Sequence, residues 1–145
     1  MVSPESSSHI LIVEADRAIG DLLQYFLEGE SYHTTLVSSL EEASVALGSQ
    51  TYHLILVDLF YPSPQLLLLA VEELHQQWTP IPVGMLSSWE FSPTAIQHLR
   101  LAFLLSKPFD LDQLLAAVAT TIQEPDSPIP CVELPEQPDA LLASL

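Results

Sequence analysis

The run Leu-Ile-Leu-Val at residues 54–57, which ends on Asp58, constrains the fold of this chain more than any other stretch. The run is too short for a helix, and the turn-forming Pro62 follows closely. Such a run is typical of a strand that is buried on both faces inside a parallel sheet. Asp58 would then lie at the carboxyl end of that strand, where open α/β sheets bind their ligands.

The composition indicates one globular domain with an acidic surface. Of 145 residues, 48% are hydrophobic, which is enough for a sizeable core. Lys and Arg number 3 against 19 Asp and Glu, and the formal net charge of −16 repels phosphate backbones and anionic lipids. We therefore expect no direct binding of nucleic acid or membranes. A single cysteine, Cys131, and the lack of any signal-peptide or membrane-spanning pattern predict a cytoplasmic protein without an intramolecular disulfide.

Short apolar runs alternate with stretches of helical periodicity along residues 9–122. We expect strands at 9–13, 32–37, 53–58, 83–86 and 102–105, and helices at 18–27, 40–47, 65–78, 93–99 and 111–122. The expected helix caps are Asp16, Ser39, Ser92 and Asp110 at the amino ends, and Gly29 and Gly48 at the carboxyl ends. This alternation with short connections predicts an α/β domain in which helices cover both faces of a five-stranded parallel sheet.

The chain divides into three segments. Residues 1–8 are a polar lead-in that we expect to be disordered, and residues 9–123 form the domain. Residues 124–139 carry five prolines and five acidic residues, and the chain then ends in Ala-Leu-Leu-Ala-Ser-Leu. We interpret residues 124–145 as an extended tail or linker.

Polar side chains follow four of the expected strands at the point where each strand ends. They are Glu14 and Asp16 after the first strand, Asp58 after the third, Ser87 and Ser88 after the fourth, and Lys107 after the fifth. Since the carboxyl ends of parallel strands meet at one edge of a sheet, we expect these groups to lie together. The carboxylates suit Mg²⁺, and Lys107, the only lysine, would offset their charge and could hold a phosphoryl oxygen. The five histidines show no metal-ligand spacing, so we expect them on strand edges and helix surfaces.

With these groups at its strand ends, the sequence resembles the receiver domain of two-component response regulators over roughly residues 9–122. The matching stretches are ILIVEAD, LILVD with Pro62 beyond it, PVGMLSS and SKPFDLDQLL, of which the last is the most specific. The resemblance implies a flavodoxin-like (βα)5 fold, a three-layer sandwich with strand order 2-1-3-4-5.

The resemblance also implies roles for individual residues. Asp58 matches the phosphoacceptor, Lys107 the lysine that pairs with it, and Ser87 the hydroxyl that contacts the phosphoryl group. The implied Mg²⁺ ligands are Glu14, Asp58, the backbone carbonyl of Phe60 and, in a secondary role through water, Asp16.

Three positions depart from the receiver pattern. Ala15 stands where a second acidic metal ligand is usual, which would weaken a Mg²⁺ site. Leu66 replaces the glycine usual eight residues after the phosphoacceptor, so we expect a reshaped loop after Asp58. Leu104, with Phe103 beside it, replaces the aromatic residue usual three before the lysine. An aliphatic side chain there cannot report phosphorylation by swinging a ring.

We therefore expect an atypical receiver that signals through protein contacts and is not an enzyme. A histidine kinase or phosphotransfer protein would phosphorylate Asp58, and a downstream protein partner would respond, with a homodimer left open. One alternative is a pseudo-receiver that binds its partner irrespective of phosphorylation. Another is a flavodoxin-like or Mg²⁺-dependent phosphatase enzyme. Against an enzyme, the chain has only 4 glycines and no glycine-rich phosphate loop, and Phe60 stands where a second aspartate would be expected.

Overall fold

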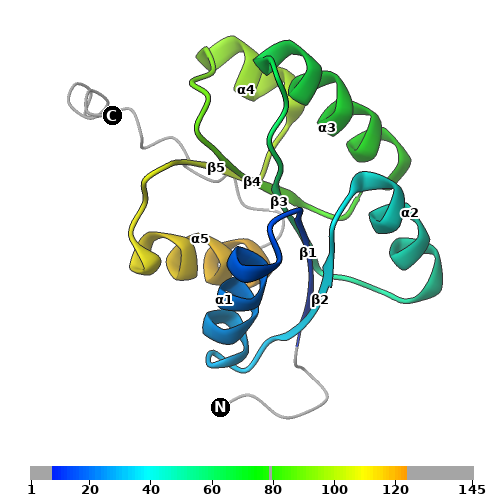
Figure 1. Cartoon of the computed structure of the whole chain (residues 1–145), viewed down its shortest axis with the longest axis vertical. Helices are drawn as coiled ribbons and strands as arrows, with labels where there is room; N and C mark the ends of the chain where they lie inside the picture. Colours follow the sequence, from blue (N-terminus) through cyan, green and yellow to red (C-terminus); the bar gives the residue numbers. More distant parts are fainter. Residues whose placement is uncertain (1–7, 79, 124–145) are drawn as a thin grey trace.

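Five strands alternate with five helices through residues 8–78 and 80–123, the part of the chain that the computed structural model describes (Figure 1). In chain order the elements are β1 (His9–Glu14), α1 (Arg17–Glu28), β2 (His33–Val37), α2 (Leu40–Ser49), β3 (Leu54–Asp58), α3 (Pro64–Trp78), β4 (Val83–Ser87), α4 (Pro93–Leu99), β5 (Phe103–Ser106) and α5 (Leu111–Gln123). Of the lead-in at 1–8 that we expect to be disordered, residues 1–7 lie outside the described residues, as does the expected tail at 124–145. No described helix is long and apolar enough to cross a membrane.

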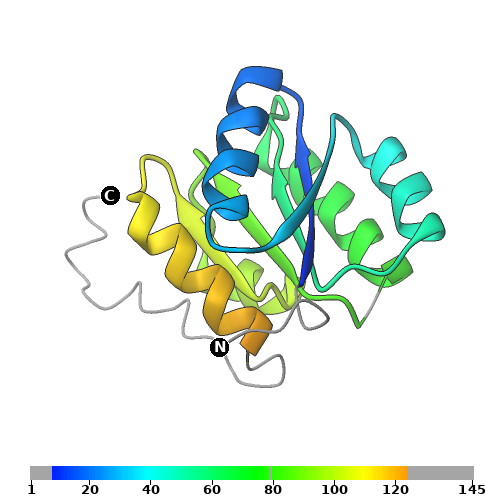
Figure 2. The same ribbon diagram turned by 90° about the horizontal axis from the view of Figure 1, so that it is seen from below.

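The strands form one parallel sheet in the order β2-β1-β3-β4-β5, as predicted. Every residue of β3 is buried, because this strand lies at the centre of the sheet with helices on both sides. α1 and α5 cover one face of the sheet, and α2, α3 and α4 cover the other (Figures 1 and 2). The prediction of a flavodoxin-like three-layer sandwich is therefore confirmed.

Local sequence signals position most of the helices. The side chains of Asp16, Ser39 and Ser92 accept hydrogen bonds from backbone N–H groups in the first turns of α1, α2 and α4, as predicted for N-caps. Asp110 precedes α5 and its backbone N–H donates to Oε1 of Gln113 at 3.0 Å, while capping by its own side chain stays a prediction. These caps fix where each helix leaves the carboxyl edge of the sheet.

The two predicted glycine stops turn out differently. α1 does end before Gly29, but Gly29 keeps a right-handed conformation (φ −64°), and the left-handed residue of the turn is Ser31 (φ 76°). The prediction that Gly48 ends α2 is wrong, since the helix continues through Gly48 to Ser49. Nothing lies within 4 Å of where a Cβ on Gly48 would be, so a larger residue would also fit at this position.

A close contact between β4 and β5 sets how these two strands pack. A Cβ added to Gly84 would lie 2.2 Å from Cζ of Phe103, so the ring occupies the space that a side chain on β4 would need. Phe103 is 1% exposed and belongs to the core beneath α1 and α5. A side chain at position 84 would clash with this ring, so glycine allows Phe103 to pack against β4.

Candidate functional site

The carboxyl edge of the sheet gathers the polar residues that the sequence placed at strand ends. Glu14, Asp58 and Ser87 are the last residues of β1, β3 and β4, and they are 6%, 4% and 3% exposed. The strand register places Glu14 directly beside Asp58. Lys107 follows β5, one residue after its last member. The expected juxtaposition of these four residues is confirmed.

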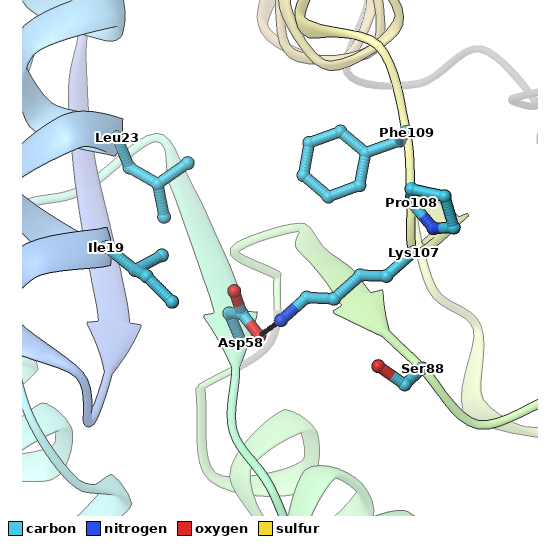
Figure 3. A pocket seen from close by; sticks show the side chains of 7 residues that line it. All are labelled: Ile19, Leu23, Asp58, Ser88, Lys107, Pro108 and Phe109. Carbon is cyan, nitrogen blue, oxygen red and sulfur yellow. Dashed lines mark hydrogen bonds and ion pairs between the residues drawn. The ribbon is translucent and has the colours of Figure 1, made fainter.

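The amine of Lys107 reaches across the sheet edge to the carboxylate of Asp58 (Figure 3). Its Nζ donates to Oδ1 of Asp58 at 2.6 Å, and the two residues are 49 positions apart in sequence. The Asp58 side chain is 5% exposed and that of Lys107 is 32% exposed. A charge-assisted hydrogen bond of this length compensates the buried carboxylate and leaves Oδ2 of Asp58 free of the lysine.

Glu14 is a second carboxylate in the same buried space. Burial and, second, the adjacent Asp58 carboxylate raise the pKa of Glu14, the backbone N–H of Asp16 and the charge of Lys107 oppose the rise, and the resulting pKa is about 7. Oε2 of Glu14 accepts from the N–H of Asp16 at 2.9 Å. Oε1 is buried without a hydrogen-bond partner among the described residues. The site therefore holds two close carboxylates and one neighbouring cation.

The donor set at this edge fits a divalent cation with few protein ligands. The unpartnered Oε1 of Glu14 and the neighbouring carboxylate of Asp58 supply oxygen atoms of the kind Mg²⁺ prefers, and Mg²⁺ often keeps several waters. Ala15 lines the same pocket and adds no carboxylate. Across residues 8–78 and 80–123, no group of three or more His, Cys, Asp or Glu side chains is placed to hold a metal ion. Any such site would depend on Glu14, Asp58 and backbone oxygens.

Asp16 acts as the N-cap of α1. Its Oδ1 accepts from the N–H groups of Ala18 and Ile19 at 3.0 and 3.3 Å, so the carboxylate caps α1. It also lines the pocket around Asp58, and its secondary role as a metal ligand through water stays a prediction. Phe60 lines this pocket as well, with an 81% exposed side chain, and the role of its backbone carbonyl likewise stays a prediction.

Two serines stand at the end of β4. Oγ of Ser87 accepts from the N–H of Trp89 at 2.9 Å, which uses one lone pair and leaves the hydroxyl proton available. Ser88 is exposed and lies close to Lys107 in Figure 3. Both serines line the pocket around Asp58, so either hydroxyl could donate to an anion bound there.

An apolar groove opens on the α1 side of Asp58, and the sequence analysis did not anticipate it. Its lining residues are Ile19, Leu23, Asp58, Ser88, Lys107, Pro108 and Phe109 (Figure 3). Ile19, in the first turn of α1, is 40% exposed and contributes to the apolar lining. The sequence feature that could have predicted this groove is the apolar pair Pro108-Phe109 directly after Lys107, because both residues line the groove beside the charged strand end.

The departures from the receiver pattern take definite places in the fold. Leu104 packs in the core beneath α2, α3 and α4, whereas the ring of Phe103 points to the opposite face and lies against Gly84. Leu66 is 48% exposed in the first turns of α3. Leu104 is thus a core side chain, and its effect on signalling stays a prediction.

Known proteins resemble this chain in both sequence and fold. The family model of the response regulator receiver domain matches residues 10–119. The transcriptional regulatory protein KdpE of Staphylococcus aureus is 33% identical over 113 residues, which cover 77% of this chain and 48% of that protein. The transcriptional regulatory protein FixJ of Bradyrhizobium diazoefficiens is 23% identical over 121 residues, which cover 82% of this chain and 58% of FixJ. The chain thus spans about half the length of these curated relatives.

Solved structures share the fold. A two-component response regulator from Clostridium difficile matches with a TM-score of 0.71 at 21% identity, over 83% of this chain and all of that one. The response regulator TrrA from Thermotoga maritima, solved in complex with Mg²⁺-BeF, matches with a TM-score of 0.65 at 23% identity, over 78% of this chain and 97% of that one. Because the family model matches more than two thirds of the chain and the strand order agrees, this protein belongs to the response regulator receiver domain family.

Proposed function

We propose that this domain accepts a phosphoryl group on Asp58 from a histidine kinase or phosphotransfer protein and passes the signal on through protein contacts, acting as a signalling protein and not as an enzyme. The observation that carries this proposal is the bond between Lys107 Nζ and Asp58 Oδ1 at the carboxyl edge of the sheet. This charge-assisted hydrogen bond compensates a buried carboxyl group and places a cation where the charge of a phosphoryl group would arrive.

The chemistry follows from the positions of the two groups. Oδ2 of Asp58 would form a new P–O bond, while the P–N bond to an imidazole of the donor breaks and the imidazole nitrogen keeps the electron pair. The ammonium of Lys107 stays protonated throughout and moves its hydrogen bond toward a phosphoryl oxygen. The hydroxyl of Ser87 or Ser88 would donate to a second oxygen. Fixed donors aimed at the transferring group lower the barrier because they need little reorganisation.

Mg²⁺ would bind through Glu14, Asp58 and the backbone carbonyl of Phe60, and when bound it would neutralise charge on the transferring oxygens. Glu14 must lose its proton to serve as a ligand, and burial together with Asp58 raises its pKa to about 7. Since Ala15 supplies no further carboxylate, we expect weak binding that strengthens as the pH rises.

The phosphodonor would approach over the apolar groove beside α1. Ile19, Pro108 and Phe109 flank Asp58 there and offer a donor protein an apolar surface close to the reacting atom. A donor seated on this groove would exclude water from the transfer. The relatives FixJ and KdpE are about twice as long and carry segments beyond the part that matches this chain.

The direct test is intact-mass spectrometry after incubation with Mg²⁺ and acetyl phosphate. We expect a phosphoryl adduct on the native protein and none on Asp58→Asn. An adduct that persists in Asp58→Asn would place the acceptor elsewhere, and no adduct on the native protein with either acetyl phosphate or a phosphorylated kinase would refute the proposal.

Ala15 favours one competing function, that of a pseudo-receiver. With one acidic ligand missing and Leu104 in place of a movable ring, the domain could bind its partner whatever the state of Asp58. The two functions differ in one measurement. A pseudo-receiver keeps the same partner affinity in Asp58→Ala and after treatment with acetyl phosphate, whereas a phosphorylation switch changes it.

A further inference from the structure

An exposed apolar surface lies where α3 begins. Four consecutive leucines occupy positions 66–69, and successive residues of a helix point about 100° apart, so they cannot all face the core. Leu67 is fully buried, whereas Leu66 is 48% and Leu69 62% exposed. Phe60, in the loop that leads into α3, is 81% exposed. We call Phe60, Leu66 and Leu69 the α3 patch.

The neighbouring helix also carries an exposed apolar residue. α2 packs beside α3 in both views of the fold (Figures 1 and 2), and Val45 on α2 is 75% exposed. Burial and, second, the charge of Glu41 raise the pKa of Tyr61, so the start of α2 lies near the loop that carries Phe60. Single exposed apolar residues are ordinary on protein surfaces, but several on adjacent elements indicate a contact surface.

The charged residues of these two helices are all acidic. Glu41 and Glu42 lie in the first turn of α2, Glu72 and Glu73 lie in α3, and neither helix contains Lys or Arg. Glu73 is exposed and follows Leu69 by four residues, on the same side of the helix. An apolar patch with a rim of carboxylates is complementary to a surface that is apolar at its centre and basic around it.

Charge also decides between the candidates that could cover the patch. A second copy of this chain carries the same net charge of −16, and residues 124–145 contain five acidic residues and no Lys or Arg. Both would be repelled by the rim. We propose that the α3 patch docks a basic amphipathic segment of another protein, with its apolar residues on Leu66 and Leu69 and its Lys or Arg residues toward Glu41 and Glu73.

This docking surface is separate from the proposed approach of the phosphodonor. α2 and α3 cover one face of the sheet, while the apolar groove beside Asp58 opens toward α1 on the other. Phe60 belongs to both the α3 patch and the pocket around Asp58. A segment on the patch would therefore touch the rim of the site without occupying the donor groove, and the inference does not require that Asp58 be phosphorylated.

The test uses the full chain and a defined probe. The probe is a fluorescein-labelled peptide of ~18 residues, about five helical turns, with leucine at helical spacing and lysine elsewhere. A second peptide carries glutamate in place of every lysine. We expect the lysine peptide to bind with a rise in fluorescence anisotropy and the glutamate peptide to give none. The Leu66→Gln/Leu69→Gln variant should bind the lysine peptide at least about tenfold more weakly.

The matched control changes exposed apolar residues on the opposite face. Leu22 and Tyr25 of α1 are 55% and 72% exposed, so Leu22→Gln/Tyr25→Gln removes comparable surface without touching α3. We expect this control to bind the lysine peptide as the native chain does, and Glu73→Gln to weaken binding less than the leucine changes. Equal weakening in the control and the α3 variant would show unspecific attraction to an acidic protein and overturn the proposal. A dimer in sedimentation velocity that dissociates in Leu66→Gln/Leu69→Gln would overturn it in favour of a second copy.

Discussion

The side chains of Lys107 and Asp58 meet at 2.6 Å although the fifth strand, which precedes the lysine, and the third, which ends on the aspartate, have β4 between them. The lysine spans the width of one strand to reach the carboxylate. This bond connects the loop after β5 to the centre of the sheet. Lys107 is the cation that the two neighbouring carboxylates, Asp58 and Glu14, share.

Loss of the lysine should destabilise the domain. In Lys107→Met, the Asp58 carboxylate is still only 4% exposed and lies next to Glu14, but it has lost its cation. We expect the free energy of unfolding in urea to fall by about 1–3 kcal/mol. This loss is smaller than for fully buried pairs because the side chain of Lys107 is 32% exposed. The control is Lys107→Met/Asp58→Asn, which also removes the stranded charge. Since no uncompensated carboxylate then remains at position 58, this double variant should regain stability, and a further loss would contradict our account of the pair.

Glu14 should make stability depend on pH. Its folded-state pKa of about 7 exceeds its ordinary value of 4.5, so the folded protein holds a proton that the unfolded chain has released between these values. The contribution of Glu14 is therefore fully present below about pH 4.5 and is lost as the pH rises through 7. Glu14→Gln should be more stable than the native protein above pH 7, by about 1–3 kcal/mol, and the difference should shrink toward pH 4.5. Urea titrations of both proteins across this range measure it, and a constant difference would refute the assignment.

His9 should act in the opposite direction. Burial, followed by the nearby His33 and His53, lowers the pKa of His9 below 6.5, and its ring forms a hydrogen bond with Oγ1 of Thr35 at 2.8 Å. Its contribution is present above pH 6.5 and is lost as the pH falls. We expect His33→Gln to raise the pKa of His9 in an NMR titration of its imidazole. An unchanged titration would show that His33 is too well solvated to matter.

A carboxylate at position 15 should strengthen metal binding. Ala15 lines the pocket beside Asp58, so Ala15→Asp adds a third acidic group at the sheet edge. We expect calorimetry to show Mg²⁺ affinity at least about tenfold higher than for the native chain, since even outer ligands contribute that much. Without Mg²⁺ the variant should melt at a lower temperature because three carboxylates repel. Ala15→Asn, which adds similar volume without charge, is the control and should show neither effect to the same degree.

The contact between Gly84 and Phe103 should tolerate no added methyl group. Gly84→Ala places a Cβ 2.2 Å from the ring of Phe103, and overpacking of this kind costs about 1–3 kcal/mol or more. Phe103→Leu removes the ring atoms that clash, so the double variant should lose less stability than the sum of the two single changes. Additive losses in urea unfolding would mean that the strands shift apart instead of clashing.

Much of the fold follows from local sequence signals. The run ending at Asp58 predicted the central strand because only a strand with both faces covered carries apolar residues without alternation. Asp16, Ser39 and Ser92 predicted helix starts because a capping side chain needs only its own next turn. The prediction that Gly48 ends α2 was wrong, because a glycine stops a helix only where the chain must turn, and α2 continues past it.

Other features could not be predicted from spacing. His9 and His33 begin neighbouring strands and are paired in register, and Nδ1 of His53 accepts from the N–H of His9 at 3.0 Å. Three histidines expected on strand edges and helix surfaces thus meet at the amino edge of the sheet. The apolar groove beside Asp58 joins α1 to the loop after β5. Both arise from strand order, which brings together residues that no local pattern connects.

The sequence by itself determined where the strands end and which polar groups stand there, because backbone periodicity and capping act over a few residues. It therefore predicted Asp58, Lys107, Glu14 and Ser87 at one edge. Only the tertiary structure decided the 2.6 Å distance between Nζ of Lys107 and Oδ1 of Asp58, the apolar groove beside Asp58, and the burial that raises the pKa of Glu14. These features depend on distances and solvent exposure across the sheet, which strand register and packing determine in the folded chain.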